Sequence, residues 1–292
     1  MSLRLEMLQI ARLSPRLLSD STDLVASYIQ SQVHEEGGFC DRAGQSDLYY
    51  TVFGLQCIHA LQMPIPDRLP GYLLRCAEKD DLDFIHTCAL VHSWANLGRD
   101  WPDNLQSQLA GRVEDFRSAD GGYHPEAGRE KGNGYGTFLA LSTYSDLGLE
   151  IPDKDRFSQT VQGFLCPDGS FCNEPGIRVG TTPTTAAGLT ASRVLGFPTP
   201  QGAVMWLFGI MEHGGFKVAA SAPVPDLLST ATALHALAGA KADLSPIKEN
   251  CLDFIDSLWV NKGGFYGTWY ETYLDVEYTF YGLLALGHLS LL

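Results

Sequence analysis

The feature that most constrains the fold of this chain is a repeated Gly-Gly-aromatic motif. It begins at Gly37, Gly121, Gly214 and Gly263, and a weaker copy begins at Gly169. The last four copies stand 45 to 49 residues apart, whereas the first interval is 84 residues. We therefore expect six units, one of which lacks the glycines and lies around "DDLDFIHTCALVHSWANLG". Repeats of this length are typical of proteins built from stacked supersecondary units.

Each unit continues after its glycines into a segment with helical periodicity. A threonine aligns these segments, at Thr51, Thr87, Thr137, Thr185, Thr230 and Thr279. Apolar residues then return at three- and four-residue steps, which indicates a helix. In four units an aspartate stands four residues before the threonine, where an N-cap belongs: Asp47, Asp83, Asp226 and Asp275.

A second helical segment precedes the glycines in each unit, and no alternating strand pattern competes with it. The sequence therefore predicts an all-α protein of about six helix pairs. Open-ended repeat proteins need polar terminal units, but the last unit here, "YTFYGLLALGHLSLL", is as apolar as the middle ones. We therefore expect a closed ring, an (α/α)6 toroid, in a single domain over residues 1–292. The helices after the glycines would form its inner ring, with their N-termini at one mouth of a central cavity.

Composition excludes several classes of partner. The net charge of −14 argues against binding to nucleic acid. No apolar run approaches the ~20 residues of a membrane span, and the N-terminal segment is typical of an amphipathic helix rather than of a signal peptide. The seven cysteines form no Cys-x-x-Cys pair, which fits reduced thiols and a cytoplasmic location.

The Gly-Gly-aromatic loops and the Asp-x-x-(Tyr/His)-Thr helix starts resemble the β subunits of protein prenyltransferases and, more loosely, squalene and terpene cyclases. The stretch "GGFCDRAGQSDLYYTVFGL" is particularly similar to a repeat of the geranylgeranyltransferase β subunit. The resemblance covers nearly the whole chain. It implies a toroid that binds an isoprenoid or lipid-like ligand in a central cavity. Two alternatives stay open: an active prenyltransferase or terpenoid-processing enzyme with an altered site, or a non-catalytic module that pairs with a helical-repeat α-type subunit.

The zinc site of protein prenyltransferases is not matched. In that family an Asp-x-Cys motif and the His of Asp-x-x-His-Thr bind the metal, and the matching positions here are Asp226, Leu228 and Tyr278. Leucine cannot bind a metal and a phenol is a poor zinc ligand, so we expect no cofactor. Asp47 and His86 repeat the spacing of an aspartate and a histidine ligand elsewhere in the ring. We expect Asp47 to cap a helix and His86 to pack in the inner ring, and a zinc site at these two residues is the alternative.

Terpene cyclases of the protonating type use an Asp-rich motif as a Brønsted acid, which burial keeps protonated. The nearest acidic run here, "KDDLDF" at residues 79–84, does not have the Asp-x-Asp-Asp order. It falls at an expected loop–helix junction. We therefore expect it to be a solvated turn.

The remaining candidates are the aromatic and acidic residues near the expected mouth. We expect Trp269, Tyr270 and Tyr278 to face the central cavity and contact its ligand. The wider set of expected ligand-binding residues is Trp269, Tyr270, Tyr273, Tyr49, Tyr50, Asp47, His86 and Tyr135, and the catalytic candidates are Asp226, Tyr278 and Asp275. The alternative for each aromatic residue is plain core packing.

Overall fold

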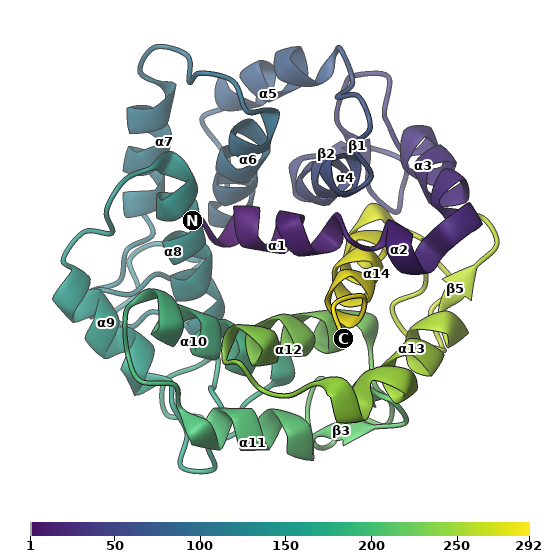
Figure 1. Cartoon of the computed structure of the whole chain (residues 1–292). Coiled ribbons are helices and arrows are strands. Elements are labelled where there is room, and N and C mark those ends of the chain that lie inside the picture. Colours follow the sequence, from purple (N-terminus) through teal and green to yellow (C-terminus); the bar gives the residue numbers. More distant parts are fainter. Residues whose placement is uncertain (1) are drawn as a thin grey trace.

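The computed structural model describes residues 2–292, which form two concentric rings of helices (Figure 1). Within those residues the inner ring consists of α4 (Leu48–Ala60), α6 (Phe84–Leu97), α8 (Gly134–Leu147), α10 (Thr182–Val194), α12 (Leu227–Gly239) and α14 (Val276–Leu289). The outer ring consists of α3 (Thr22–Ser31), α5 (Leu69–Ala77), α7 (Leu105–Glu114), α9 (Lys154–Gly163), α11 (Gln201–Gly209) and α13 (Lys248–Ser257). Outer and inner helices alternate along the chain, so the predicted all-α toroid of six helix pairs is confirmed.

Small elements complete the fold. The Gly-Gly loops of three units contain two-residue antiparallel strand pairs: β1 (Phe39–Cys40) with β2 (Ser46–Asp47), β3 (Met211–Glu212) with β4 (Gly215–Phe216), and β5 (Trp259–Val260) with β6 (Gly264–Phe265). The chain begins with α1 (Leu3–Ala11) and α2 (Pro15–Leu18), and 3-10 turns lie at Ser19–Ser21 and Ser245–Ile247. Within residues 2–292 no helix has the length and hydropathy to cross a bilayer.

In four units the repeated threonine joins the loop to the inner helix. The hydroxyl of Thr51 donates to the carbonyl oxygen of the N-cap residue Asp47 at 2.6 Å and accepts the backbone N–H of Phe39 at 2.9 Å. The ring of Phe39 then lies against Gly54, where an added Cβ would stand 2.3 Å from it. Threonines in other units accept the matching aromatic N–H at 2.9 to 3.1 Å. The hydroxyl is therefore the attachment point between loop and helix.

All six inner helices begin with a capping side chain. Asp47, Asp83, Asp226 and Asp275 accept the N–H of the third residue that follows them, as predicted. Asn133 and Thr181 have the same role in α8 and α10. The six N-termini therefore meet at one end of the ring.

The last unit closes the ring on the first. Helix α14 packs against both α12 and α4. Gly263, in the loop before α14, sits directly on α3, where an added Cβ would lie 2.1 Å from the Leu24 carbonyl oxygen. The expected contact between the N-terminal and C-terminal units is present.

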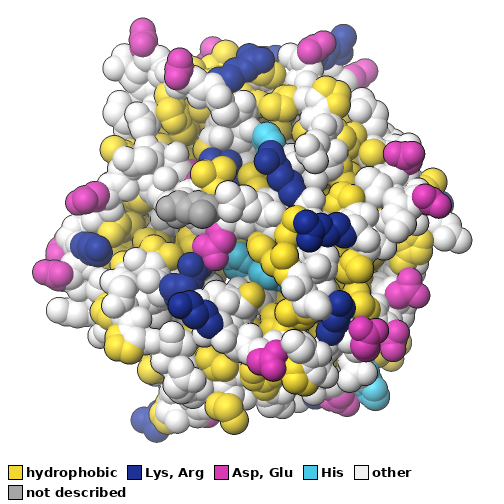
Figure 2. Space-filling view, in the orientation of Figure 1, with side chains coloured by type: hydrophobic (Ala, Val, Ile, Leu, Met, Phe, Trp, Pro, Cys, Tyr) yellow, Lys and Arg dark blue, Asp and Glu magenta, His cyan; other side chains and the backbone are white. Residues whose placement is uncertain are grey.

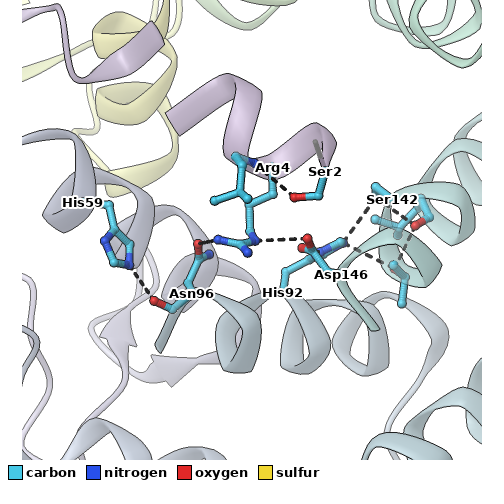
Figure 3. Close-up of polar contacts among 10 residues, drawn as sticks. Ser2, Arg4, His59, His92, Asn96, Ser142 and Asp146 are labelled. Carbon is cyan, nitrogen blue, oxygen red and sulfur yellow. Dashed lines mark hydrogen bonds and ion pairs between the residues drawn. The ribbon is translucent and has the colours of Figure 1, made fainter. Parts of the chain in front are cut away.

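Helix α1 crosses the end of the ring where the inner helices finish (Figures 1 and 3). Arg4 lies between α6 and α8: its Nη1 donates to Asn96 Oδ1 at 3.0 Å, and its Nε pairs with Asp146 at 3.1 Å. Glu6 pairs with Arg193 near the end of α10 at 2.8 Å. On this face, Lys and Arg side chains surround the centre of the ring (Figure 2). The first helix thus closes one mouth of the toroid.

Substitution of two glycines tests the ring closure. Gly263 and Gly44 both have positive φ, at 94° and 79°, but no atom lies within 4 Å of a Cβ added at Gly44. Gly44→Ala should therefore cost only backbone strain, about 1 kcal/mol. Gly263→Ala should cost roughly 2–4 kcal/mol, because overpacking against α3 adds to the strain. Urea denaturation measures both; equal losses would contradict the contact that closes the ring.

Candidate functional site

A central cavity of about 290 Å³ lies inside the inner ring. The second residue of five inner helices lines its first layer: Tyr49, Ile85, Tyr135, Pro183 and Leu228. One turn further along, every inner helix contributes to the second layer: Phe53, Ala89, Leu139, Ala187, Thr232 and Tyr281. Because side chains four residues apart share a helix face, the helical register alone sets most of this wall.

The two ends of the cavity differ. Tyr135 lines the cavity and is 43% exposed, so the end formed by the N-termini of the inner helices reaches solvent. At the other end Leu3 and Met7 of α1 form part of the wall. Three polar side chains lie in the third layer toward this closed end: His92, Thr190 and His235.

Glu277 lies behind the first layer, bonded to the lining residue Tyr49, and does not itself line the cavity. It is the second residue of α14, the position that lines the cavity in the other five inner helices. Only 8% of Glu277 is exposed, and the hydroxyl of Tyr49 donates to its Oε1 at 2.6 Å. Burial raises the pKa of this carboxyl to about 7, and the nearby Asp275 adds to the shift. Glu277 can therefore hold or release a proton near neutral pH.

Sequence reasoning missed Glu277, although a signal was present. The Asp-x-x-(Tyr/His)-Thr pattern draws attention to the third residue of each inner helix, which is Tyr278 in the last unit. The second residue is the one that faces inward, as Tyr49 and Tyr135 show. Aligning the six units on their threonines places Glu277 in that register.

Asp275, a catalytic candidate, is a buried helix cap. It accepts the backbone N–H of Tyr278 at 2.8 Å and the Nε–H of Arg42 at 2.9 Å. Burial raises its pKa despite these contacts. The guanidinium of Arg42 also lies 5.6 Å from the centre of the Tyr278 ring and 3.6 Å from Glu271. Arg42 therefore contacts Asp275, Glu271 and the ring of Tyr278.

Asp226 and the pair Asp47–His86 are also structural in this geometry. Asp226 caps α12 by accepting the N–H of Ser229 at 2.7 Å, and burial raises its pKa. His86 Nε2 lies 3.3 Å from Asp47, and its Nδ1 lies 2.9 Å from Asp83. The hydrogen bond to Asp47 is the largest of the influences that raise the pKa of His86 to about 9. His86 and Asp47 thus form an ion pair beside the mouth.

The expected position of the aromatic residues after Gly263 needs correction. Trp269 packs on α13, with its ring 5.7 Å from that of Phe254, and its indole N–H donates to Ser257 at 2.8 Å. Tyr270 and Tyr273 are 77% and 58% exposed. All three lie outside the cavity wall, because the loop before α14 runs over the outer ring.

Tyr278 and Tyr50 are also not lining residues. Both are the third residue of their helix, one position past the residue that faces inward. Tyr278 instead packs beneath Gly267, where an added Cβ would meet its ring at 2.3 Å. Of the predicted ligand-binding residues, Tyr49 and Tyr135 are the two that the structure places in the wall.

The sequence matches the prenyltransferase alpha-alpha toroid domain at residues 5–90, 75–179 and 189–290. The chain belongs to this family. No curated protein matches the sequence of this toroid.

Solved structures share the fold of this toroid at low sequence identity. The type II terpene cyclase MstE from Scytonema, without ligand, has a TM-score of 0.64 and 14% identity over 94% of this chain and 97% of that chain. A structure of an MstE variant in complex with geranylgeranyl dihydroxybenzoate has a TM-score of 0.64 and 13% identity over 95% and 97%. The Candida albicans protein geranylgeranyltransferase-I complexed with GGPP has a TM-score of 0.62 and 14% identity over 91% and 89%.

The toroid's residues do not fit the prenyltransferase zinc site. Leu228 has no donor atom and lines the cavity, and burial raises the pKa of the Tyr278 phenol, which opposes the phenolate that a metal would need. Within residues 2–292 no group of three or more His, Cys, Asp and Glu side chains is placed to hold a metal ion. Leu228 and Tyr278 therefore do not supply zinc ligands at the two positions where the prenyltransferase pattern has them.

The raised pKa of Glu277 predicts a pH-dependent stability. In the unfolded chain this carboxyl ionises near its usual value of 4.5, whereas in the folded protein it does so at about 7. The folded state therefore binds an extra proton between these values, and stability falls as the pH rises from about 4.5 to 7. The loss should approach about 3 kcal/mol. It is measured as the difference between wild-type and Glu277→Gln denaturation curves; a difference that does not vary from pH 4.5 to 8 would contradict the assignment.

Proposed function

We propose that the toroid binds an isoprenoid or similarly long apolar chain in its central cavity. The observation that carries this proposal is the wall itself, in which five aromatic rings (Tyr49, Phe53, Tyr135, Phe138 and Tyr281) stand among aliphatic side chains. A largely apolar pocket with a few polar groups suits such a ligand. The geranylgeranyl ligands named for MstE and for the Candida enzyme support the same ligand class.

Zinc-dependent transfer of a prenyl diphosphate is not the chemistry that this site favours. Binding a diphosphate takes several fixed cations, and the residues described as lining the cavity include no Lys or Arg. Arg42 is held by Asp275 and Glu271 at the rim, and Lys217 pairs with Glu212 at 2.6 Å. The proposal therefore concerns the apolar chain rather than a diphosphate head group.

A substitution that fills the cavity tests this binding. Ala187 lies in the second layer of the wall, so Ala187→Phe should occupy ligand space and weaken the binding of farnesol and geranylgeraniol by tenfold or more. Met205→Phe is the matched control, because Met205 is 70% exposed on the outer helix α11. Calorimetric titration measures both. Equal affinities in Ala187→Phe and the control would place the ligand outside the cavity.

A second function is favoured by one observation, the buried carboxyl of Glu277. A neutral carboxylic acid beside an apolar cavity can protonate an alkene. The O–H bond of Glu277 would break as a C–H bond forms at the less substituted alkene carbon, which leaves a tertiary carbocation and a Glu277 carboxylate. Attack by the next double bond would close a ring, and loss of a proton from carbon to water would end the reaction. Water would then return a proton to the Glu277 carboxylate. The product is an isomer of the substrate, so no oxidant or reductant is required.

The residues around Glu277 fit this role. Tyr49 holds one carboxyl oxygen at 2.6 Å and is itself part of the cavity wall. The rings of Tyr49 and Phe53, 5.1 Å apart, present π faces that can stabilise a carbocation. Phe53 also lies 5.6 Å from the Tyr281 ring. The Glu277 carboxyl therefore lies next to a group of aromatic rings formed by Tyr49, Phe53 and Tyr281.

Deuterium incorporation tests the protonation step. Geranylgeraniol and geranylgeranyl dihydroxybenzoate incubated with the protein in D₂O should give cyclised isomers that carry one new C–D bond. Glu277→Gln should lower this activity by at least 100-fold, while Glu277→Asp keeps a proton donor and should keep part of it. Mass spectrometry reads both results. Undiminished turnover by Glu277→Gln would exclude Glu277 as the acid.

Pairing with a helical-repeat α-type subunit stays a separate prediction. The exposed Trp269, Tyr270 and Tyr273 lie on one loop over the outer ring, where a protein partner could reach them. An interaction role without ligand binding would leave the cavity empty of ligand when the protein is purified with its partner.

A further inference from the structure

His235 brings an unusual polar group to the closed end of the cavity. It lies in the third turn of α12, lines the cavity and is 7% exposed. Its Nδ1 stands 3.0 Å from Nε2 of His288, which lies near the end of α14. The two rings are 5.2 Å apart and inclined at 62°. The Nδ1 atom of His235 is thus hydrogen-bonded to His288.

The other nitrogen is unpaired. Within residues 2–292, Nε2 of His235 is buried and has no hydrogen-bond partner. A buried polar atom without a partner destabilises the folded protein, so its persistence in a cavity wall calls for an explanation. The other histidines at this end do have partners: His92 Nδ1 bonds Asp146 at 2.8 Å, and His59 Nε2 bonds the Asn96 carbonyl oxygen.

The histidine pair is uncharged at neutral pH. Burial lowers the pKa of His235 to about 4, with Glu6 and Arg193 acting in opposite directions. Burial and the neighbouring His235 lower the pKa of His288 to about 3. A neutral imidazole has one donor and one acceptor nitrogen. If His235 Nδ1 donates to His288, then His235 Nε2 is an acceptor; if Nδ1 accepts, Nε2 is a donor. In either case Nε2 can form a hydrogen bond with a ligand.

The ligand group that matches this nitrogen is neutral. Glu6 and Arg193, the charged side chains that act on His235, are paired with each other at 2.8 Å. Arg4 is likewise held by Asp146 and Asn96. The described residues that line the cavity include no Lys or Arg, so an anion bound at His235 would leave water without a cation beside it, which is costly. A hydroxyl or a carbonyl oxygen carries no such cost and can complete the hydrogen bond.

We propose that His235 Nε2 forms a subsite, at the α1 end of the cavity, for a neutral oxygen function on the ligand. The subsite fixes how deep the chain enters and which end enters first. It rests on the proposed function, since it requires an apolar chain in the same cavity. The Thr232 hydroxyl, one turn nearer the open mouth, is already used by the Leu228 carbonyl oxygen at 2.8 Å. Of the described polar side chains that line this end, His235 is the one with a buried nitrogen that has no hydrogen-bond partner.

A pair of probes isolates this hydrogen bond. The first is farnesol hydroxylated at its far terminal carbon, so that either orientation presents a hydroxyl to the closed end. The second is the same C15 triene without oxygen. Dissociation constants for both, with wild type and His235→Leu, give the change in the diol-to-hydrocarbon affinity ratio. We expect His235→Leu to shift this ratio about tenfold toward the hydrocarbon.

His59→Leu is the matched control, because His59 is a partnered histidine at the same end and outside the cavity wall. It should leave the ratio unchanged. If both probes bind and His235→Leu also leaves the ratio unchanged, the subsite is wrong while cavity binding stands. If neither probe binds the wild type, the proposed function fails and the subsite fails with it.

A measurement on the wild-type protein covers the case in which His235→Leu does not fold. The imidazole ¹⁵N signals of His235 can be assigned from the spectrum of His235→Gln and followed during titration. Saturation with the diol should move the Nε2 signal by several ppm, whereas the hydrocarbon should leave it nearly in place. Equal shifts with both probes would overturn the proposal.

Discussion

The architecture depends on one small interaction, the hydroxyl of the repeated threonine. In the first unit Thr51 donates to the carbonyl oxygen of the helix cap and accepts the N–H of Phe39 from the preceding loop. Thr137, Thr185 and Thr230 likewise accept the N–H of the loop aromatic residue, and Thr230 also donates to the carbonyl oxygen of its helix cap. The aromatic ring then seats on a glycine of the inner helix, as Phe171 does on Gly188. Loop and helix are thus fixed together in four of the six units, which present the same helix face to the centre.

Repetition of that contact gives the central cavity a regular wall. Once every inner helix has the same rotation, its second residue and the residue one turn later face the cavity. The chemistry of the site then follows from which side chains occupy these positions. Glu277 and Tyr49 give the open end an acid and its hydrogen-bond donor, and His235 gives the closed end a neutral base. Helix α1 makes the two ends unlike, because it covers only one of them.

The sequence predicts the ring more completely than it predicts the site. Repeat spacing and helix caps are local patterns, so the six pairs and the capping positions of Asp47, Asp226 and Asp275 could be inferred directly. The position of α1 could not, because Arg4 meets Asn96 and Asp146, 92 and 142 residues away. Among the residues expected at the cavity, Tyr49 and Tyr135 line it, whereas Tyr50 and Tyr278 lie one position past the residue that faces inward.

That error has a simple physical cause. Tyr278 follows Glu277 in the chain, but a step of one residue turns a side chain by about 100° around the helix, from the cavity toward the neighbouring loop. Trp269 was misplaced for a different reason. Its nearness in sequence to the Gly-Gly motif says nothing about the direction of the loop, which an indole bond to Ser257 on α13 fixes.

The central claim is that the space inside the inner ring is the ligand site. A crystal structure of the protein grown with geranylgeraniol tests it most directly. The account predicts continuous density for the chain, running from Tyr135 and Tyr49 at the open mouth toward His235 beneath α1. A fully occupied chain on the outer surface, with only water inside the ring, would contradict it.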